Sequence, residues 1–163
     1  MTAQQPLQVV PIATVVGGHT EVLDDYQGGV ESIIRLHDTY PPDEMFQGLE
    51  EFSHITVTWH FHRASPDDVH LHARSPRNNP RWPATGPLAH RNHRRPNQLA
   101  ITYPRLLDID GRDLLVTDLD AVDGTPVVDI GPYFTAMGPR GPVKEPAWPG
   151  EMLKDYWRDA ESR

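Results

Sequence analysis

Histidines and arginines gather around one Pro-Asn pair in the stretch HRNHRRPNQLA, residues 90–100. A guanidinium can hold a carboxylate or a phosphate through two parallel hydrogen bonds, and an imidazole can exchange a proton near neutral pH. These residue types are therefore suited to holding an anionic ligand and to moving a proton. The structural alternative is a solvated turn in which Asn97 bonds to its own backbone.

The basic residues are separated from the acidic ones along the chain. No Asp or Glu occurs from Val69 to Leu107, although seven of the 15 Lys and Arg residues lie there. The other eight are outnumbered by 23 acidic residues, a balance of -15 within a formal net charge of -8. A positive segment in a negative body is typical of a site for an anionic ligand. The acidity of the whole chain argues against broad, non-specific binding along nucleic acid but permits a local contact with a folded RNA.

Two pairs of histidines have a spacing that suits a metal, His60/His62 and His70/His72. Alternate residues of a strand point the same way, and neutral imidazoles bind transition metals. No carboxylate stands at a complementary spacing nearby, so we predict no metal site, and a metal-dependent barrel enzyme remains an alternative. The lack of cysteine excludes thiolate chemistry, and the sequence contains neither a phosphate-binding glycine loop nor a nucleophile elbow.

The elements that must position these residues are predicted to be mainly β-strands. Seventeen prolines and twelve glycines in 163 residues disfavour long helices, because proline removes a backbone donor and clashes with the preceding turn. The strongest strand pattern is SHITVTWHFHR, residues 53–63, in which apolar and polar residues alternate. The apolar face holds Ile55, Val57, Trp59 and Phe61, and the polar face holds His54, Thr56, Thr58, His60 and His62.

Weaker patterns predict the remaining elements. Strands are expected over residues 7–16 and over 28–38, the latter with Val30, Ile33 and Leu36 pointing inward. Three more strands are expected over 97–134, with Asp-Gly turns within 109–113 and 122–126. Short helices are expected over 41–52, with Met45, Phe46 and Leu49 on one face, and over 149–161, with Met152, Tyr156 and Trp157 on one face.

Length and composition favour one domain over residues 1–134, followed by a Pro- and Gly-rich tail, 135–163, without a second domain. The long connection after residue 63 is rich in Pro, Asn and Arg, which is typical of a functional loop. The first residues lack the basic head and apolar core of a secretory leader, and no run of 18 residues is apolar. We therefore predict a cytoplasmic protein without a membrane partner.

Three blocks together resemble the TrmO/TsaA-like family, whose members are S-adenosylmethionine-dependent enzymes that N6-methylate a threonylcarbamoyl-modified adenosine in tRNA. The blocks are GLEEFSHITVTWHFHR, GPLAHRNHRRPNQLAITYPRL and DLDAVDGTPVVDIGPY, and they occur in the order and separation of the family. The resemblance implies a mostly β (α+β) protein, a compact β-barrel with short helices and a C-terminal helix. It also implies a homodimer with S-adenosylmethionine near the subunit interface, which the aromatic residues of GPYF and EMLKDYWRD also favour.

Matching motif positions imply which residues contact the cofactor. Arg91 or Arg95 would pair with its carboxylate, Asp123 would accept from its ammonium or ribose hydroxyls, and Gly124 would permit close approach. The full set of implied cofactor residues is Tyr26, Gln27, Gly28, His62, Arg63, Arg91, Arg95, Asn97, Ile101, Asp123, Gly124, Thr125 and Pro126. An ordinary hairpin turn is the alternative interpretation of Asp123-Gly124.

The acceptor and the base are less determined by the motifs. An amine acceptor must lose a proton, to water or to an imidazole, and His93 and His62 are the candidate bases, with His90 as a third. This chain differs from the usual residues of the family block at His90, Asn92, Gln98 and Ala100, so the block does not determine which molecule accepts the methyl group. If tRNA is the acceptor, we expect it to contact the long loop, and if a small molecule is, the loop would form a lid over the pocket. The residues expected there are Arg74, Arg77, Arg81 and Trp82. A non-catalytic protein that binds S-adenosylmethionine or an adenosine derivative is a further alternative.

Overall fold

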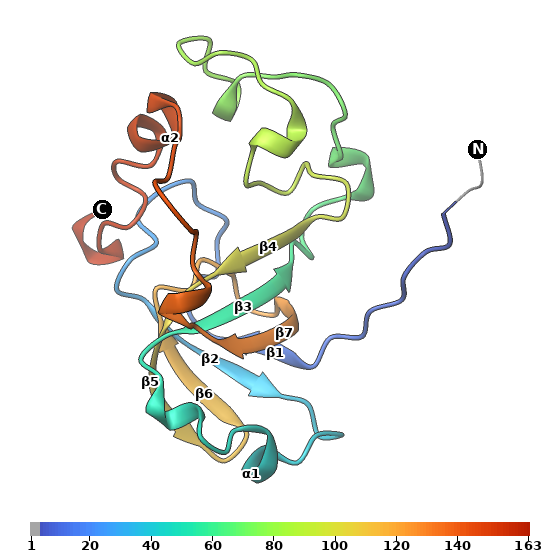
Figure 1. Ribbon diagram of the computed structural model, residues 1–163, viewed down its shortest axis with the longest axis vertical. Coiled ribbons are helices and arrows are strands. Elements are labelled where there is room, and N and C mark those ends of the chain that lie inside the picture. The colour runs from blue at the N-terminus through green and yellow to red at the C-terminus, as the bar shows by residue number, and fades with distance from the viewer. Residues whose placement is uncertain (1–3) are drawn as a thin grey trace.

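The structure, a computed structural model, describes residues 4–163 (Figure 1). Seven strands form one antiparallel sheet in the order β4-β3-β7-β1-β2-β6-β5. They are β1 Ala13–Val16, β2 Glu31–Leu36, β3 Ile55–His60, β4 Leu99–Thr102, β5 Arg105–Asp110, β6 Asp113–Thr117 and β7 Pro126–Pro132. The helices are α1 Pro42–Met45 and α2 Ala147–Met152, and 3-10 turns occur at Leu49–Glu51, Pro66–Asp68, Pro76–Asn78, Pro87–Ala89, Thr135–Met137 and Ala160–Ser162.

The sheet curls so that its two edges approach each other. The edge strands β4 and β5 are consecutive in the chain, separated only by Tyr103 and Pro104. The chain between and after these two strands also hydrogen-bonds to the start of β3. Ile55 N–H donates to Pro104 O at 3.1 Å, and Leu106 N–H donates to Ser53 O at 2.9 Å. The prediction of a mostly β, barrel-like fold is confirmed, although the barrel is not strictly closed.

One face of the sheet forms the core. Ile55, Val57 and Trp59 alternate into it from β3, as their spacing predicts, and Ala13 and Val15 enter from β1. The other buried members of the cluster are Ile34, Leu36, Phe46, Leu114, Val116, Leu119, Ala121 and Val127. This core fixes the strand ends from which the functional loops emerge.

Two predicted strands differ from the observed ones. Residues 7–11 form no strand, because pairing of β1 with β2 and β7 begins at Ala13 and Pro11 has no N–H to donate. In β2 the buried side chains are Ser32, Ile34 and Leu36, so Leu36 points inward as predicted and Ile33 does not, since residues on one strand face recur every second position. The region 97–134 contains four strands, not three, and both predicted Asp-Gly turns are present within it.

Both predicted helices are shorter than expected. Only Pro42–Met45 is α-helical in the first, where Phe46 is buried and Met45 is exposed. The C-terminal helix ends at Met152, so Tyr156 and Trp157 lie beyond it and do not share a helix face with Met152. The chain leaves the helical path there because its next residues hydrogen-bond to the connection between β1 and β2.

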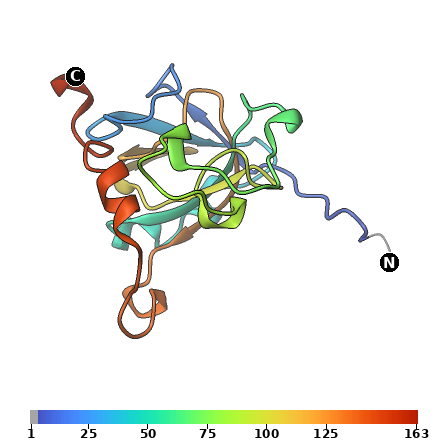
Figure 2. The ribbon, with the colours of Figure 1, turned by 90° about the horizontal axis from the view of Figure 1, so that it is seen from above.

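The central loop, residues 61–98, lies over one end of the sheet with α2 beside it (Figures 1 and 2). Trp82 Nε1 donates to Glu151 in α2 at 2.9 Å, and the rings of His90 and Trp148 lie 5.8 Å apart. The loop and the C-terminal segment, residues 147–160, are therefore joined to each other. None of the helices formed by residues 4–163 has the length and apolar character needed to cross a membrane.

Candidate functional site

The connections at one end of the sheet carry most of the predicted site residues. The β1–β2 connection, residues 17–30, meets the β6–β7 connection, residues 118–125, through hydrogen bonds. Asp123 N–H donates to His19 O at 2.7 Å, and Gly17 N–H donates to the Asp123 carboxylate at 2.7 Å. Asp123 is exposed, so its second carboxylate oxygen can face a ligand.

His62 and Gly124 meet at a corner beside Asp123. Gly124 has φ +82°, and a Cβ at that position would lie 3.6 Å from His62 Nε2. Burial, and then the charges of Arg63 and His60, lower the pKa of His62, whereas Asp123 opposes this shift. The imidazole therefore stays neutral at pH 7 and can accept a proton. Arg63 donates to Thr20 O of the β1–β2 connection at 2.6 Å. The turn after β3 and the β6–β7 connection therefore meet beside the β1–β2 connection, and this corner carries four of the predicted residues: His62, Arg63, Asp123 and Gly124.

Thr125 and Pro126 follow the Asp123-Gly124 turn and fix its end at the start of β7. Thr125 is fully buried, and its hydroxyl donates to Val122 O at 2.7 Å. Pro126 opens β7 opposite Thr14 of β1. Neither side chain presents a free polar group to a ligand, so their contribution is to fix the path of the Asp123-Gly124 pair.

Arg91 and Arg95 occupy the open edge of the sheet at β4. The Arg91 guanidinium donates to Ile101 O at 2.6 Å, and that of Arg95 donates to Leu99 O. Arg91 is exposed and pairs with no acidic residue among those described, so its remaining N–H groups can bind a carboxylate. The Ile101 side chain, 43% exposed, adds an apolar surface beside it.

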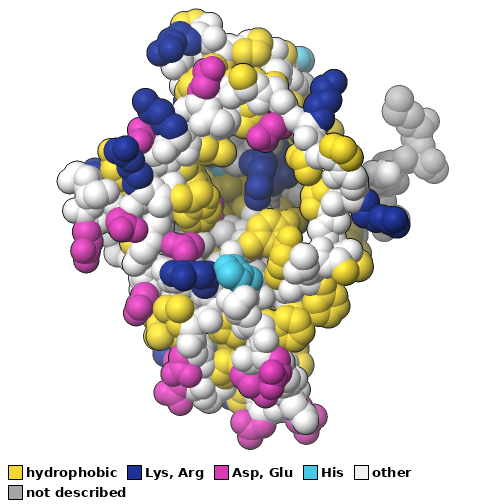
Figure 3. Space-filling view, turned by 60° about the vertical axis from the view of Figure 1, so that its left-hand side comes forward, with side chains coloured by type: hydrophobic (Ala, Val, Ile, Leu, Met, Phe, Trp, Pro, Cys, Tyr) yellow, Lys and Arg dark blue, Asp and Glu magenta, His cyan; other side chains and the backbone are white. Residues whose placement is uncertain are grey.

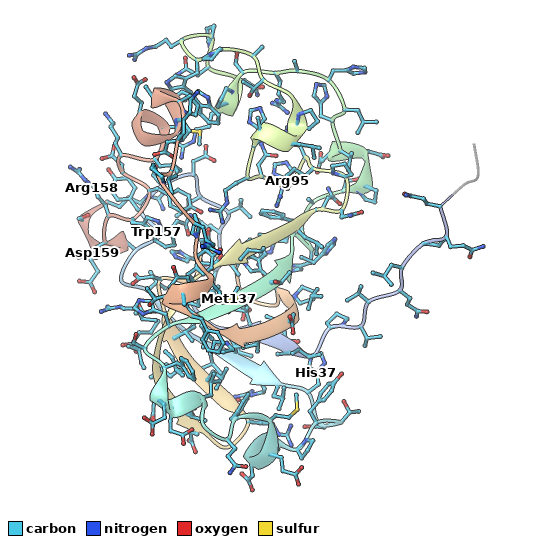
Figure 4. All side chains as sticks on the ribbon, viewed as in Figure 1. His37, Arg95, Met137, Trp157, Arg158 and Asp159 are labelled. Atoms are coloured by element: carbon cyan, nitrogen blue, oxygen red, sulfur yellow. The ribbon has the colours of Figure 1, made fainter. Side chains whose placement is uncertain are left out.

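Arg95 is the more enclosed of the two arginines. It lies between the central loop and β4 (Figure 4), and burial, followed by the charge of Arg91, lowers its pKa. The guanidinium also donates to Asn92 O at 3.5 Å, so Arg95 ties the loop to the strand. Asn97 is exposed in the turn that precedes β4.

Tyr26, Gln27 and Gly28 are occupied by the C-terminal segment. Their N–H groups donate to the carbonyls of Asp155, Tyr156 and Arg158 at 3.1, 2.7 and 3.1 Å. The Gln27 side chain is buried and donates to Leu23 O at 2.7 Å. With the segment in place these three backbone donors cannot also bind a cofactor, which sets Tyr26–Gly28 apart from the residues of the His62–Asp123 corner.

Asp120 in the β6–β7 connection was not predicted from the sequence. Asp120 accepts hydrogen bonds from the Thr102 hydroxyl on one carboxylate oxygen and from the Tyr156 hydroxyl on the other. Trp59 Nε1 in turn donates to Thr102 Oγ1 at 3.0 Å. The signal in the sequence was the run DLDAVD, whose three aspartates lie in one loop. Asp118, the first of them, accepts from Gly29 N–H at 2.9 Å.

The candidate bases differ in their surroundings. His93 packs edge-on against Phe61, with ring centroids 6.1 Å apart. Burial, and then the charge of Arg94, lower the pKa of His93. Gln98 fixes this part of the loop by donating to His93 O and Ser65 O, each at 2.9 Å. His90 is buried, and its Nε2 lies 2.9 Å from the Thr85 hydroxyl, so His90 supports the loop rather than facing a ligand.

The loop residues predicted to contact an acceptor are held in different ways. Arg77 forms a bidentate pair with Asp25, at 2.9 and 3.0 Å, and also donates to Asp24 O at 2.6 Å. Arg74 donates to the Asn78 side chain, whereas Arg81 is exposed. Neither Arg74 nor Arg81 forms an ion pair within residues 4–163. Trp82 is bonded to Glu151, so the loop that would form a lid is attached to the C-terminal segment.

The two histidine pairs form no metal centre. His60 ends β3 and His62 lies in the turn after it, with His62 N–H donating to His60 O at 2.8 Å, so the alternation of a strand does not align them. The rings of His70 and His72 lie 5.9 Å apart in a segment without a strand. Nowhere in the described part of the chain are three His, Asp or Glu side chains grouped to hold a metal ion.

The face that carries the C-terminal segment is hollowed. Figure 3 shows a basic side chain at the floor of this hollow and hydrophobic side chains around it. Two aromatic pairs lie at the outer ends of β4 and β7, Tyr103 with Tyr133 at 5.5 Å and Phe52 with Phe134 at 5.7 Å. A cation, a carboxylate and apolar surface at one end of the sheet fit a zwitterionic ligand with an aromatic group, such as S-adenosylmethionine.

Comparison with known proteins identifies a family and related proteins. The family described as tRNA-methyltransferase O N-terminal domain matches residues 24–138. The mouse protein named tRNA (adenine(37)-N6)-methyltransferase is 35% identical over 93 residues, which are 57% of this chain and 21% of that protein. A probable S-adenosyl-L-methionine-binding protein of Methanothermobacter thermautotrophicus is 38% identical over 104 residues, 64% of this chain and 70% of that protein.

A solved structure shares the fold. The crystal structure of TrmO from Pseudomonas aeruginosa superposes with a TM-score of 0.71 at 22% sequence identity, covering 90% of this chain and 63% of that one. The chain therefore spans about a fifth of the mouse relative and about two thirds of the bacterial structure.

Proposed function

The chain belongs to the tRNA-methyltransferase O N-terminal domain family, and from this premise we propose that it transfers a methyl group from S-adenosylmethionine to the N6 atom of a modified adenosine in tRNA. The observation that carries the proposal is the corner in which His62, Asp123 and Gly124 meet, with Arg91 bonded to the edge strand β4, all inside the matched residues. Bound S-adenosylmethionine would supply an electrophilic methyl group.

Two charged groups of the chain would orient the cofactor. Arg91 keeps N–H donors free and would bind the carboxylate, while Asp123 would accept from the ammonium or the ribose hydroxyls through its free oxygen. Gly124 leaves space next to His62 for an approaching ring. Such positioning supplies much of the rate of an in-line transfer.

His62 is the better placed of the two candidate bases. It lies in the same corner as Asp123, and its lowered pKa keeps the imidazole neutral, which is the form that takes a proton. His93 is likewise held neutral, but it packs against Phe61 under the loop. We propose that His62 takes the proton released from the amine of the acceptor.

The tRNA would dock on the central loop through Arg74, Arg81 and Arg94. None of these three has an acidic partner within the described residues, so each is available to a phosphate. Arg77 is set aside because Asp25 already neutralises it. With a small-molecule acceptor instead, the same loop and Trp82 would cover the pocket.

We also propose that two copies associate through the exposed aromatic surface at the ends of β4 and β7. Tyr133 is 39% and Phe134 50% exposed, and Met137 next to them is 80% exposed. Figure 4 places Met137 in front of the sheet, away from the core. Burying these side chains against a second copy would remove apolar surface from water. The cytoplasm remains the proposed location, since tRNA is found there.

Mass spectrometry of tRNA nucleosides tests the function in the cell. A strain lacking the gene should lose one N6-methylated adenosine derivative and accumulate its unmethylated form, and a plasmid with the gene should restore it. An unchanged nucleoside profile, with the protein shown to be expressed in the parent strain, would count against tRNA as the acceptor.

A further inference from the structure

Residues 153–160 of the C-terminal segment contact the candidate site although they lie beyond the family match, which ends at residue 138. They run beside the β1–β2 connection, and in addition to the three bonds from Tyr26–Gly28, Ala160 N–H donates to Gly28 O at 3.1 Å. The contact is close: a Cβ on Gly28 would lie 2.3 Å from Trp157 O, so only glycine fits there.

Tyr156 carries this segment into the site. Its hydroxyl donates to the carboxylate of Asp120, which the Thr102 hydroxyl also contacts on the other oxygen. Burial, and then the charge of Asp120, raise the pKa of Tyr156, so the phenol stays protonated and remains a donor.

Asp120 lies in the middle of the connection that ends in the Asp123-Gly124 turn. The aspartates on either side tie the same connection to the β1–β2 connection, Asp118 to Gly29 N–H and Asp123 to Gly17 N–H. Asp120 ties it to β4 and to the C-terminal segment. Without the Tyr156 hydroxyl, one oxygen of Asp120 would lose its hydrogen bond, and the connection would lose this tie to the C-terminal segment.

We propose that Tyr156 is a positioning residue of the cofactor site: it holds Asp120 and so keeps in place the 118–125 connection, which carries the Asp123-Gly124 turn. The inference rests on the proposed binding of S-adenosylmethionine. It makes the C-terminal segment part of the site.

The test is Tyr156→Phe in the full chain, which keeps the ring and removes only the hydroxyl. The dissociation constant for S-adenosylmethionine, measured by calorimetry, should rise by about 3- to 30-fold, a fraction of the effect of losing a hydrogen bond to a charged group. Amide hydrogen exchange of residues 118–125 in the free protein should accelerate by about tenfold while that of β1 and β3 stays unchanged. Arg158→Ala is the matched control, since the Arg158 side chain points away from the site (Figure 4) and pairs with Asp155 at 3.2 Å.

The Asp120→Asn background tests whether the effect passes through Asp120. In that background Tyr156→Phe should add little to either readout. Unchanged exchange and affinity in Tyr156→Phe would overturn the proposal, as would accelerated exchange spread evenly over all strands, which indicates a general loss of stability. If the unmutated chain binds no S-adenosylmethionine, the proposed function fails, and the exchange of the free protein still decides whether Tyr156 positions the connection.

Discussion

Arg77 is predicted to stabilise the fold rather than to bind tRNA. Its guanidinium makes two bonds to the Asp25 carboxylate and a third to Asp24 O, and the two side chains are 25% and 27% exposed. Exposed ion pairs contribute about 0.2–1 kcal/mol and hydrogen bonds to charged groups about 1.5–3 kcal/mol. Solvent screening places this bidentate, partly exposed pair between these values, at about 1–2 kcal/mol. Arg77→Ala should therefore lower the unfolding midpoint by about 2 to 8 °C in a protein of this size.

The assay combines thermal unfolding by circular dichroism with tRNA binding at two salt concentrations. Arg77→Ala should lower the midpoint and leave the salt dependence of tRNA binding unchanged. Arg81→Ala, in the same loop and exposed, should do the reverse, because Arg81 forms no ion pair with any described residue. If Arg77→Ala keeps the parent unfolding midpoint and reduces the salt dependence of tRNA binding, Arg77 binds tRNA and does not stabilise the fold.

The remaining predictions concern the ligand, the base, the docking surface and the assembly. Arg91→Ala should raise the dissociation constant for S-adenosylmethionine by roughly 10- to 150-fold in calorimetry, and an unchanged constant would remove Arg91 from the site. The pKa of His62 is lowered from 6.5, so the rate of methyl transfer should stay constant from pH 8 down to pH 6.5 and fall only at lower pH, where the imidazole becomes protonated. If His62→Gln shows the same fall of the rate at low pH, the imidazole is not the base. Sedimentation of the parent at tens of micromolar should show a dimer and that of Phe134→Asp a monomer, whereas a monomeric parent would contradict the proposed interface. Three loop arginines should be replaced together by alanine: Arg74, Arg81 and Arg94. The slope of the logarithm of the tRNA binding constant against the logarithm of the salt concentration should then decrease in magnitude by about 2 to 3 units. A slope equal to the parent's would exclude these arginines as phosphate contacts.

The sequence predicted those parts of the fold that local patterns determine. The alternation in residues 53–63 identified β3 and its buried side chains, and the two Asp-Gly turns were found because glycine reaches positive φ without strain. The lengths of β1 and of the C-terminal helix depend on distant partners, which no local pattern records. Residues 7–11 have strand-forming side chains but no strand to pair with, and residues 155–158 leave the helix to bond with Tyr26–Gly28.

The candidate site was predictable where a motif carried it. His62, Asp123 and Gly124 meet at one corner, and Arg91 bonds to the edge strand β4, whereas binding of the cofactor by these residues stays a prediction. Tyr156 and Asp120 were not found, because a tyrosine hydroxyl and an aspartate 36 residues apart in sequence leave no local signal of their hydrogen bond. Arg77 was expected at a phosphate because its charge is visible in the sequence and its pairing with Asp25 is not.

Transfer of a labelled methyl group tests the central claim most directly. Purified protein is incubated with S-adenosylmethionine labelled in the methyl group and with tRNA isolated from a strain lacking the gene, and the digested nucleosides are separated. We predict label in an N6-methylated adenosine derivative, with the transfer strongly reduced in Arg91→Ala. Binding of S-adenosylmethionine without label in any tRNA nucleoside would contradict the proposed function.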